Sequence, residues 1–407
     1  MRPPLNIAIV TPRLQLFEAV EAIGAHTYQL TPDAPAPDVL VFPAGTSKVF
    51  MESVRAARDL PAAVRKRAAE GKLRVVIDGS SEGAEHWPVR AEHIHSIIAN
   101  VGVTADKAFY VGQEVNYGRE YSAWCAEEGI PEQFRVLHHD AWVWRFLQQF
   151  EDSGAEVLSR RLAAFRARPA VRSRRLVSLN YTPRPHKVLF LLRLLKDGLW
   201  DKAFVSFGGV ARYREIFGCA DNAAMTEHLA KLEGFADMAH DLADQLPGLE
   251  AFGRVVLDPP VQGKFDPHLD ADLPEYAQSW FAVVSETEMH PRPSRITEKA
   301  MKALVNFEPF LVLGNPHVLK AIRGHGFETF GEVFDEAYDE VLDPRQRFDL
   351  VYEQVRRFAL MSDAELAAME RQVTDRLMHN AEWGLTRMSG DLRRAAFSAL
   401  IDKILEA

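Results

Sequence analysis

The chain has 407 residues, of which 47% are hydrophobic and 26% charged, the balance of a soluble globular protein with enough chain for two domains. No apolar run reaches the roughly 18–20 residues that a membrane helix needs, and the apolar start has no signal cleavage site. A net charge of −9 argues against a nucleic-acid partner. Because Cys125 and Cys219 are the only cysteines, we expect no disulfide framework and a cytoplasmic location.

The first half of the chain alternates short apolar runs with amphipathic stretches. The runs have the length and composition of buried strands in a parallel sheet, and they cover residues 5–10, 39–42, 73–77, 108–111 and 134–137. An amphipathic stretch over residues 51–69 predicts one of the helices between them. We therefore expect a Rossmann-like α/β domain over residues 1–165, with helices on both faces of its sheet.

A second alternating series predicts another Rossmann-like domain, over residues 170–391. Its expected strands cover residues 176–179, 203–207, 254–257, 280–284 and 310–313. The chain ends in helices: Ser362 and Glu365 form a capping box, the following helix is expected to reach about residue 380, and a C-terminal helix occupies residues 392–407. Two such domains in tandem predict a ligand cleft outside the carboxyl ends of the strands.

Residues 160–175, at the junction of the two domains, are rich in arginine. This composition suits a lipid headgroup, and so a peripheral membrane contact, or a protein partner. A solvated linker is the simpler interpretation.

The segment S-L-N-Y-T-P-R-P-H-K, residues 178–187, follows one expected strand and opens a helix. Backbone N–H groups at a helix N-terminus favour an anion, so Asn180, Arg184 and Lys187 beside them predict a phosphate pocket. A proline-shaped loop with solvated basic side chains is the alternative. The sequence has neither a G-x-G-x-x-G fingerprint nor a Walker A motif, and so gives no support to dinucleotide or P-loop chemistry.

The next motif places acidic and basic residues between a strand and a helix. The strand ends in Glu286, and Thr297 caps a helix that has Glu298 and Lys299 in its first turn. A cation in the first turn costs roughly a few tenths of a kcal/mol against the helix dipole. A bound diphosphate would offset this cost, with Lys299 pairing with the phosphates and Glu298 accepting ribose hydroxyls. An ordinary surface helix start is the alternative.

The third motif, P-F-L-V-L-G-N-P at residues 309–316, reads as a strand, a glycine turn and a helix start. Gly314 and Asn315 would let the backbone approach a nucleotide closely. A tight strand-to-helix turn without a ligand explains the same pattern.

Together these segments resemble the donor-binding region of fucosyltransferase-like glycosyltransferases. The likeness lies in F-A-V-V-S-E-T-E, I-T-E-K-A-M-K-A-L and P-F-L-V-L-G-N-P-H-V-L-K, while the segment at residues 178–187 is similar to the loop that opens the same domain in bacterial and phage-encoded relatives. The resemblance covers residues 176–340. It implies a GT-B fold of two facing Rossmann-like domains with a helical C-terminus. It further implies that the second domain holds a nucleoside-diphosphate sugar and that no metal is required.

Residue by residue, Glu298 and Lys299 match the pair that contacts ribose and diphosphate in that family. Glu286 matches its acidic strand end, and Arg184 matches its basic contact. The sequence departs from the pattern in the isoleucine before Thr297 and in a His-Pro pair in the preceding loop.

Other residues have the types that bind metals, but not the surroundings. Asp270 and Asp272 form a D-x-D sequence that sits in a polar loop, away from a strand end. The histidines at positions 93, 95, 138 and 139 have no convincing third ligand nearby. We therefore expect neither a metal nor another cofactor. The absence of a G-x-S-x-G elbow disfavours an α/β-hydrolase.

The loop D-G-S-S-E-G follows the strand at residues 73–77, at the strand end where a Rossmann-like domain places functional groups. A carboxylate there would deprotonate an acceptor hydroxyl, and Glu82 is the first candidate and Asp78 the second. A glycine-rich turn capped by carboxylates is the alternative.

These features predict a hexosyltransferase that moves a sugar from a nucleoside-diphosphate sugar to a carbohydrate or glycoconjugate acceptor in surface polymer synthesis. A nucleotide-sugar epimerase or hydrolase, or a non-catalytic protein of glycan assembly, remains as the alternative.

Overall fold

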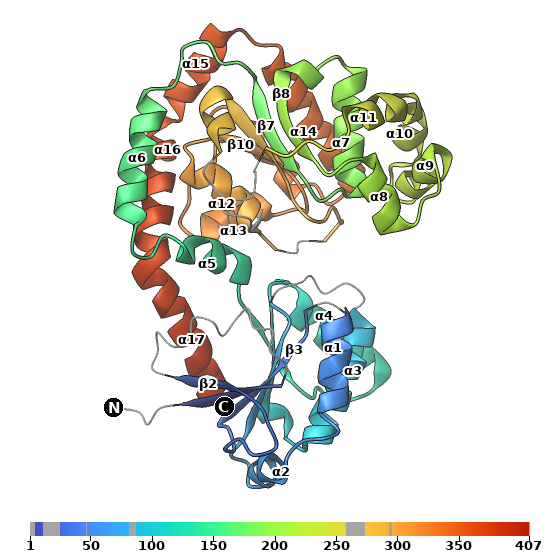
Figure 1. The fold of residues 1–407 in the computed structure, drawn as a ribbon, viewed down its shortest axis with the longest axis vertical. Coiled ribbons are helices and arrows are strands. Elements are labelled where there is room, and N and C mark those ends of the chain that lie inside the picture. Colours follow the sequence, from blue (N-terminus) through green and yellow to red (C-terminus); the bar gives the residue numbers. More distant parts are fainter. Residues whose placement is uncertain are drawn as a thin grey trace. The chain divides into compact units, whose positions relative to one another are not determined.

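The structure, a computed structural model, describes residues 5–10, 25–45, 47–80, 87–257, 273–292 and 295–406. The chain divides into two compact units, residues 1–145 with 390–407 and residues 146–389, each built on its own sheet (Figure 1). No helix within the described ranges is long and apolar enough to cross a membrane.

The first unit contains a six-stranded parallel sheet in the order β2-β1-β3-β4-β5-β6. The strands are β1 (Asn6–Ile9), β2 (His26–Gln29), β3 (Val39–Pro43), β4 (Arg74–Asp78), β5 (Ala108–Gly112) and β6 (Arg135–His138). Its helices are α1 (Ser47–Ala56), α2 (Ala62–Ala69), α3 (Trp87–Val101), α4 (Tyr117–Glu128) and α17 (Arg393–Leu405), and α5 (Ala141–Gln148) leads out of the unit. Side chains from α1 to α4 form a core on one face of the sheet. Helix α17 lies on the other face, where the Leu405 carbonyl accepts a hydrogen bond from Arg74 (Figure 1).

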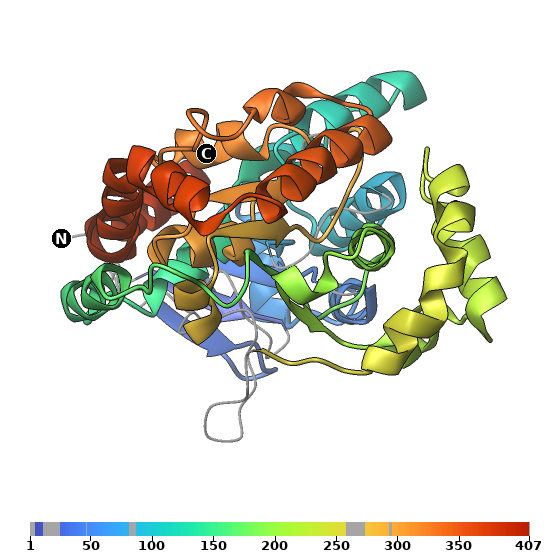
Figure 2. The same ribbon diagram turned by 90° about the horizontal axis from the view of Figure 1, so that it is seen from above.

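The second unit contains a four-stranded parallel sheet in the order β10-β9-β7-β8. The strands are β7 (Leu176–Asn180), β8 (Ala203–Phe207), β9 (Phe281–Ser285) and β10 (Phe310–Leu313). The helices are α6 (Gly154–Arg166), α7 (Pro185–Lys196), α8 (Val210–Phe217), α9 (Asn222–Ala230), α10 (Ala236–Asp241), α11 (Leu246–Phe252), α12 (Glu298–Val305), α13 (Val318–Gly324), α14 (Pro344–Ala359), α15 (Asp363–Gln372) and α16 (Thr374–Glu382). Helices α8 to α11 gather at the β8 side of this sheet (Figures 1 and 2).

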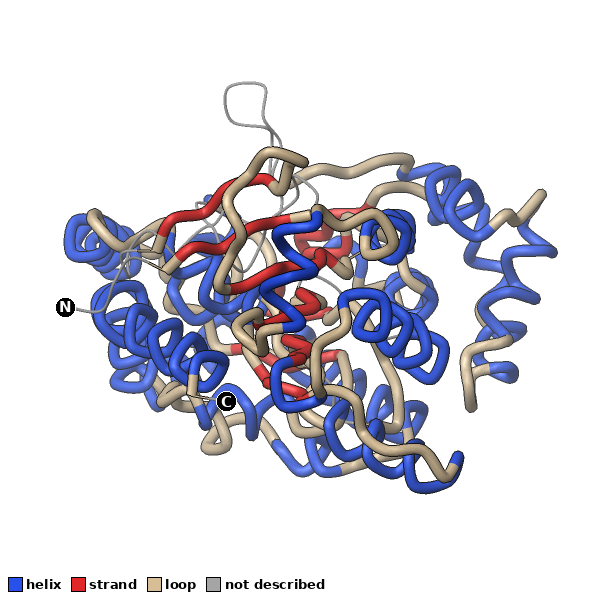
Figure 3. The backbone as a smooth tube through the Cα atoms, turned by 90° about the horizontal axis from the view of Figure 1, so that it is seen from below, coloured by secondary structure: helices blue, strands red, loops and turns tan. Residues whose placement is uncertain are grey.

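The strand order of the second sheet reverses between β7 and β9. The chain passes from β7 to β8 on one side, then returns to add β9 and β10 on the other. In parallel α/β sheets, ligands bind outside the carboxyl ends of the strands at this switch point. Figure 3 shows the strands, in red, among the helices that connect them.

The expected α/β class, two parallel sheets and helical C-terminus are confirmed. The strand expected at residues 254–257 is wrong, because only Val255 pairs there, in an isolated antiparallel bridge with Phe207. The stretch at residues 51–69 forms two helices, since Pro61 stands between them and lacks the N–H that a continuous helix needs. The capping box at Ser362 is confirmed, but its helix ends at Gln372 and α16 follows.

Candidate functional site

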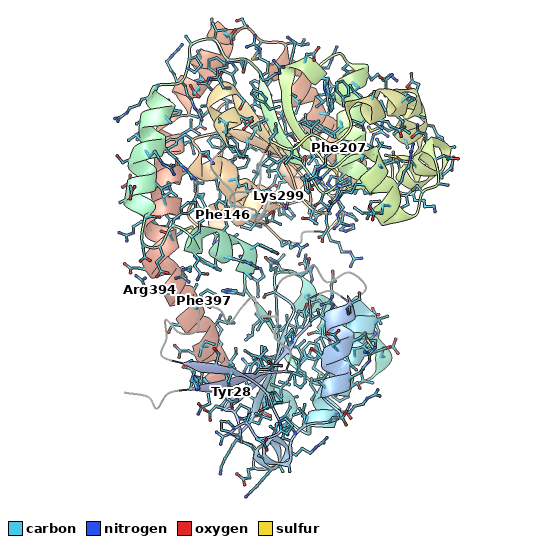
Figure 4. All side chains as sticks on the ribbon, viewed as in Figure 1. Tyr28, Phe146, Phe207, Lys299, Arg394 and Phe397 are labelled. Carbon is cyan, nitrogen blue, oxygen red and sulfur yellow. The ribbon has the colours of Figure 1, made fainter. Side chains whose placement is uncertain are left out.

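The candidate site lies at the carboxyl edge of the second sheet, at the switch point between β7 and β9. Asn180 ends β7, Glu286 follows β9 and Gly314 follows β10, so three of the predicted site residues share one edge. Helices α7 and α12 both begin at this edge, with Pro185 at the start of α7 and Thr297 capping α12. Lys299, in the first turn of α12, is labelled in Figure 4.

His186 joins the two loops across the switch point. Its Nε2 lies 3.0 Å from the backbone oxygen of Glu286, and because a carbonyl only accepts, Nε2 must carry the hydrogen. Burial, assisted by the charge of Lys187, lowers the pKa of His186 to about 3. The ring is therefore neutral at physiological pH and acts as a fixed donor. No local pattern in the sequence indicates this contact, since the two residues are far apart in the chain.

The buried carboxylate of Glu286 holds the N-terminus of α12. Oε1 accepts from the Thr297 backbone N–H at 3.3 Å, and Oε2 accepts from the Thr297 hydroxyl at 2.6 Å. Burial raises the pKa of Glu286, while the charge of Lys299 and the Thr297 hydrogen bond oppose the rise. A Cβ at Gly314 would lie only 2.8 Å from the Glu286 Cβ, so the glycine makes room for this side chain. We infer that Glu286 positions Thr297.

Lys299 is held by the chain's own oxygen atoms. Its ammonium lies 2.8 Å from Oε1 of Glu298 and within 3.4 Å of the hydroxyls of Thr287 and Thr297. The Thr297 hydroxyl also accepts from the Lys299 backbone N–H, as a helix cap does. Glu298 therefore offsets part of the unfavourable charge at this helix start, which had been expected to need a bound diphosphate.

Lys187 and Arg184 bring two further cationic groups to the same edge. Lys187 is only 3% exposed. Burial, together with the charge of Lys299, lowers the pKa of Lys187 to about 7, against the opposing effects of Glu286 and Glu298. Arg184 precedes α7, and its buried Nε has no partner within the described part of the chain. A buried ammonium and a buried guanidinium donor without a partner are both costly, so this pair favours an anionic ligand.

Asn180 presents an unused acceptor. Ser178 Oγ donates to the Val283 carbonyl at 3.0 Å, and the Asn180 amide nitrogen donates to that same hydroxyl at 2.9 Å. This chain of bonds fixes the amide orientation and leaves Oδ1, which is buried and has no partner among the described residues. The group that completes it must be a donor, such as a hydroxyl or a water molecule.

Gly314 and Asn315 help to hold the loop that follows β9. Asn315 Oδ1 accepts from the His290 backbone N–H at 2.5 Å. Buried Arg347, on α14, donates to the Gly314 carbonyl and to the His290 carbonyl, both at 2.7 Å. Sequence reasoning missed Arg347, because nothing in its local pattern distinguishes it from a surface arginine.

The two candidate bases lie in the first unit. Asp78 is 5% exposed, and its Oδ1 accepts from the backbone N–H of Ser80 at 3.0 Å and from its hydroxyl at 2.5 Å. This geometry stabilises the turn after β4. Glu82, like Asp270 and Asp272, lies outside the described residues.

The histidines weighed as metal ligands have partners of other kinds. His95 bonds the Tyr121 hydroxyl, and His138 contacts Asp140 and the Gln113 carbonyl. Within the described ranges, one group, His317 with Asp339 and Glu340, places its ligand atoms within 4.8 Å of one another. Both Asp339 oxygens accept backbone N–H groups at the start of α13, which is a structural role in itself.

No protein-family model and no curated protein matches the chain. Among solved structures, it is similar to the N-terminal domain of trehalose-6-phosphate phosphatase from Candida albicans, with 9% identity, 99% of this chain and 96% of that chain covered, and a TM-score of 0.45. It is also similar to the α,α-trehalose 6-phosphate synthase from Burkholderia multivorans, with 11% identity, 93% of this chain and 72% of that chain covered, and a TM-score of 0.41. The UDP-GlcNAc 2-epimerase from Neisseria meningitidis is similar with 9% identity, 99% of this chain and 100% of that chain covered, and a TM-score of 0.39. These distant likenesses assign neither a family nor an activity.

Replacing Thr297 tests the bracing of α12. Thr297→Val removes the helix cap and one partner of a buried carboxylate, so we expect a loss of about 2–4 kcal/mol in the free energy of unfolding. Thr297→Ser keeps the hydroxyl and should lose less than about 1 kcal/mol. Urea denaturation followed by circular dichroism measures both. A Thr297→Val variant as stable as the unmodified chain would contradict the assignment.

Proposed function

We propose that the protein is a glycosyltransferase that transfers a sugar from a nucleoside diphosphate to a hydroxyl acceptor. The observation that carries the proposal is the convergence of Arg184, Lys187 and Lys299 with the N-termini of α7 and α12 at the switch point of the second sheet. Helix N-termini and cations together favour a diphosphate. The resemblance of residues 176–340 to fucosyltransferase-like enzymes supports the same conclusion, with a GT-B arrangement and fucose as the first sugar to test.

In this proposal each group at the site has a separate task. Lys187 and Arg184 donate to the diphosphate oxygens, and Lys299 supplies a third positive charge while it stays bonded to Glu298. Glu298 accepts from a ribose hydroxyl, and the unused Oδ1 of Asn180 accepts from a hydroxyl of the donor.

During transfer, negative charge grows on the diphosphate as the bond to the sugar breaks. Fixed cations and helix N-termini in a buried site stabilise that charge without a metal ion. Glu82, or failing it Asp78, takes the proton of the acceptor hydroxyl. The acceptor is a carbohydrate or glycoconjugate.

Two other functions use the same donor site. An epimerase or hydrolase would change or release the sugar without an acceptor, and a non-catalytic protein of glycan assembly would bind the nucleotide sugar only. Each of these functions would use the same anion-binding residues, but neither needs a general base that deprotonates an acceptor.

A panel of nucleotide sugars, including GDP-fucose, separates these functions. We expect nucleoside diphosphate to be released only when a hydroxyl acceptor is present, and release to continue in EDTA. Release without an acceptor would favour a hydrolase or epimerase, and binding without release would favour a non-catalytic protein. Activity lost in EDTA and restored by manganese or magnesium would contradict the metal-independent mechanism. It would direct attention to Asp270, Asp272 and the group at His317.

Lys299→Ala tests the donor site. Removing a charge-assisted contact should weaken nucleoside diphosphate binding by about 1.5–3 kcal/mol in isothermal titration calorimetry. The free energy of unfolding should also fall, by about 1–3 kcal/mol, because the buried carboxylate of Glu298 loses its ion-pair partner. Lys320→Ala, which removes an exposed lysine from the neighbouring helix α13, is the matched control and should bind normally. Unchanged affinity and stability in Lys299→Ala would make Lys299 a surface residue.

The low pKa of Lys187 predicts a pH dependence of binding. Only the protonated ammonium attracts the diphosphate, so affinity should be highest below the pKa of about 7 and fall as the pH rises above it. The limiting slope is about one log unit per pH unit. The ligand should be a nucleotide sugar, whose diphosphate does not titrate in this range.

Lys187→Met should bind more weakly and lose this slope, and thermal unfolding checks that the variant is folded. A flat profile in the unmodified protein, or an unchanged slope in Lys187→Met, would contradict the role of Lys187.

A further inference from the structure

A second group of cations lies at the carboxyl edge of the same sheet, at the β8 side. Tyr181 directly follows β7, Arg212 is in the first turn of α8, and Arg254 precedes the bridge between Val255 and Phe207. Phe207, at the end of β8, is labelled in Figure 4. Three segments that are distant in sequence therefore meet at the kind of sheet edge where α/β proteins bind ligands. None of the three residues was a candidate from the sequence.

Both guanidinium groups converge on one phenol. The Cζ of Arg212 lies 5.0 Å from the centre of the Tyr181 ring, and the Cζ of Arg254 lies 5.3 Å from it. Arg254 donates to the Tyr181 hydroxyl at 2.7 Å, and Arg212 donates to the same oxygen at 3.5 Å. Each arginine uses one donor of the five that a guanidinium carries.

No carboxylate among the described residues balances these two charges. Other arginines that reach helices α8 to α11 are paired with carboxylates: Arg214, on α8, lies 3.0 Å from Glu250, and Arg345, on α14, lies 2.6 Å from Asp237. Arg212 and Arg254 are exposed, and within the described part of the chain their guanidinium groups donate hydrogen bonds to Tyr181. Two like charges held on one ring repel each other, so an anion with two negative charges would be bound favourably.

Two glycines allow the backbone to pass close to Tyr181 and Arg212. A Cβ at Gly208 would lie 2.4 Å from the Tyr181 carbonyl oxygen and 2.8 Å from Cδ of Arg212. Gly209 has a φ of +95°, a conformation that favours glycine. It precedes α8 without a side-chain cap, so the first N–H groups of that helix add positive potential beside Arg212.

We propose that Tyr181, Arg212 and Arg254 form a second anion subsite that binds the phosphate monoester of a phosphorylated sugar. The inference rests on the proposed function in taking this sugar as the acceptor. A phosphate monoester carries close to two negative charges at neutral pH and matches the two guanidinium groups, whereas a carboxylate leaves one of them unbalanced.

Isothermal titration calorimetry with matched sugars tests the subsite. The probes are hexose 1-phosphates and 6-phosphates, the free hexoses, a hexuronic acid and inorganic phosphate. The unmodified chain should bind a hexose phosphate at least about tenfold more tightly than the free hexose or the uronic acid. Arg212→Ala and Arg254→Ala should each remove most of that preference. Equal affinity for hexose and hexose phosphate would overturn the proposal.

Arg174→Ala is the matched control. Arg174 is half-buried and also stacks on an aromatic ring, Phe204, but it precedes β7 and so lies at the amino edge of the sheet. The control should bind hexose phosphate normally. An equal loss in the control, or normal binding by the Arg212→Ala, Arg254→Ala double variant, would overturn the subsite.

Nucleoside diphosphate binding by the same double variant separates this inference from the proposed function. The double variant should bind the nucleotide as the unmodified chain does, since the residues proposed to bind the diphosphate lie at the starts of α7 and α12. A chain that binds nucleotide but shows no preference for phosphorylated sugars refutes the subsite and leaves the proposed function standing. A chain that binds no nucleotide refutes the proposed function itself.

Discussion

The burial of one carboxylate, that of Glu286, determines how the candidate site is arranged. Burying a neutral polar group without a hydrogen bond costs roughly 2–7 kcal/mol. Burying an ionised group costs more, unless hydrogen bonds and opposite charges surround it. Thr297 supplies two hydrogen bonds, Lys299 supplies charge, and Gly314 supplies the space. The N-terminus of α12 is consequently fixed against β9, and His186 fixes the N-terminus of α7 to the same loop. Both helix starts are thus in place before any ligand binds.

The charges around this carboxylate do not balance internally. Arg184, Lys187 and Lys299 stand against the carboxylates of Glu286 and Glu298, and burial lowers the pKa of Lys187 to about 7. A lysine that has lost part of its charge in this way gains from any anion that restores it. The same burial that makes the ammonium costly makes its attraction for a diphosphate strong, because both effects come from the low local dielectric. The free energy lost by burying the Lys187 ammonium would therefore be recovered in part when an anion binds.

Much of this arrangement could be predicted from the sequence because its signals are local. Buried parallel strands appear as short apolar runs, and all four strands of the second sheet were expected at their positions. Thr297, Glu298 and Lys299 stand out because a cap and the first helical turn are read within a few residues.

The features that were missed depend on contacts between distant segments. His186 reaches Glu286, and Arg347 reaches Gly314 and His290, with no local pattern to announce either contact. The segment at residues 254–257 is not a strand for a similar reason, since only Val255 finds a pairing partner. Tyr181 illustrates the limit most clearly: the sequence places it in a loop, and only the fold brings Arg212 and Arg254 to its ring.

Two groups of cations along one sheet edge differ in burial, and this difference has chemical consequences. Lys187 is almost completely buried, whereas Arg212 and Arg254 are exposed. Buried cations act through a low dielectric and suit a group on which charge grows during reaction, since solvent does not have to reorganise there. Exposed arginines act through screened charge and hydrogen bonds, so they orient a ligand that must enter and leave. In the proposed reaction, the buried cations would hold the diphosphate of the donor and the exposed arginines would orient the phosphorylated acceptor.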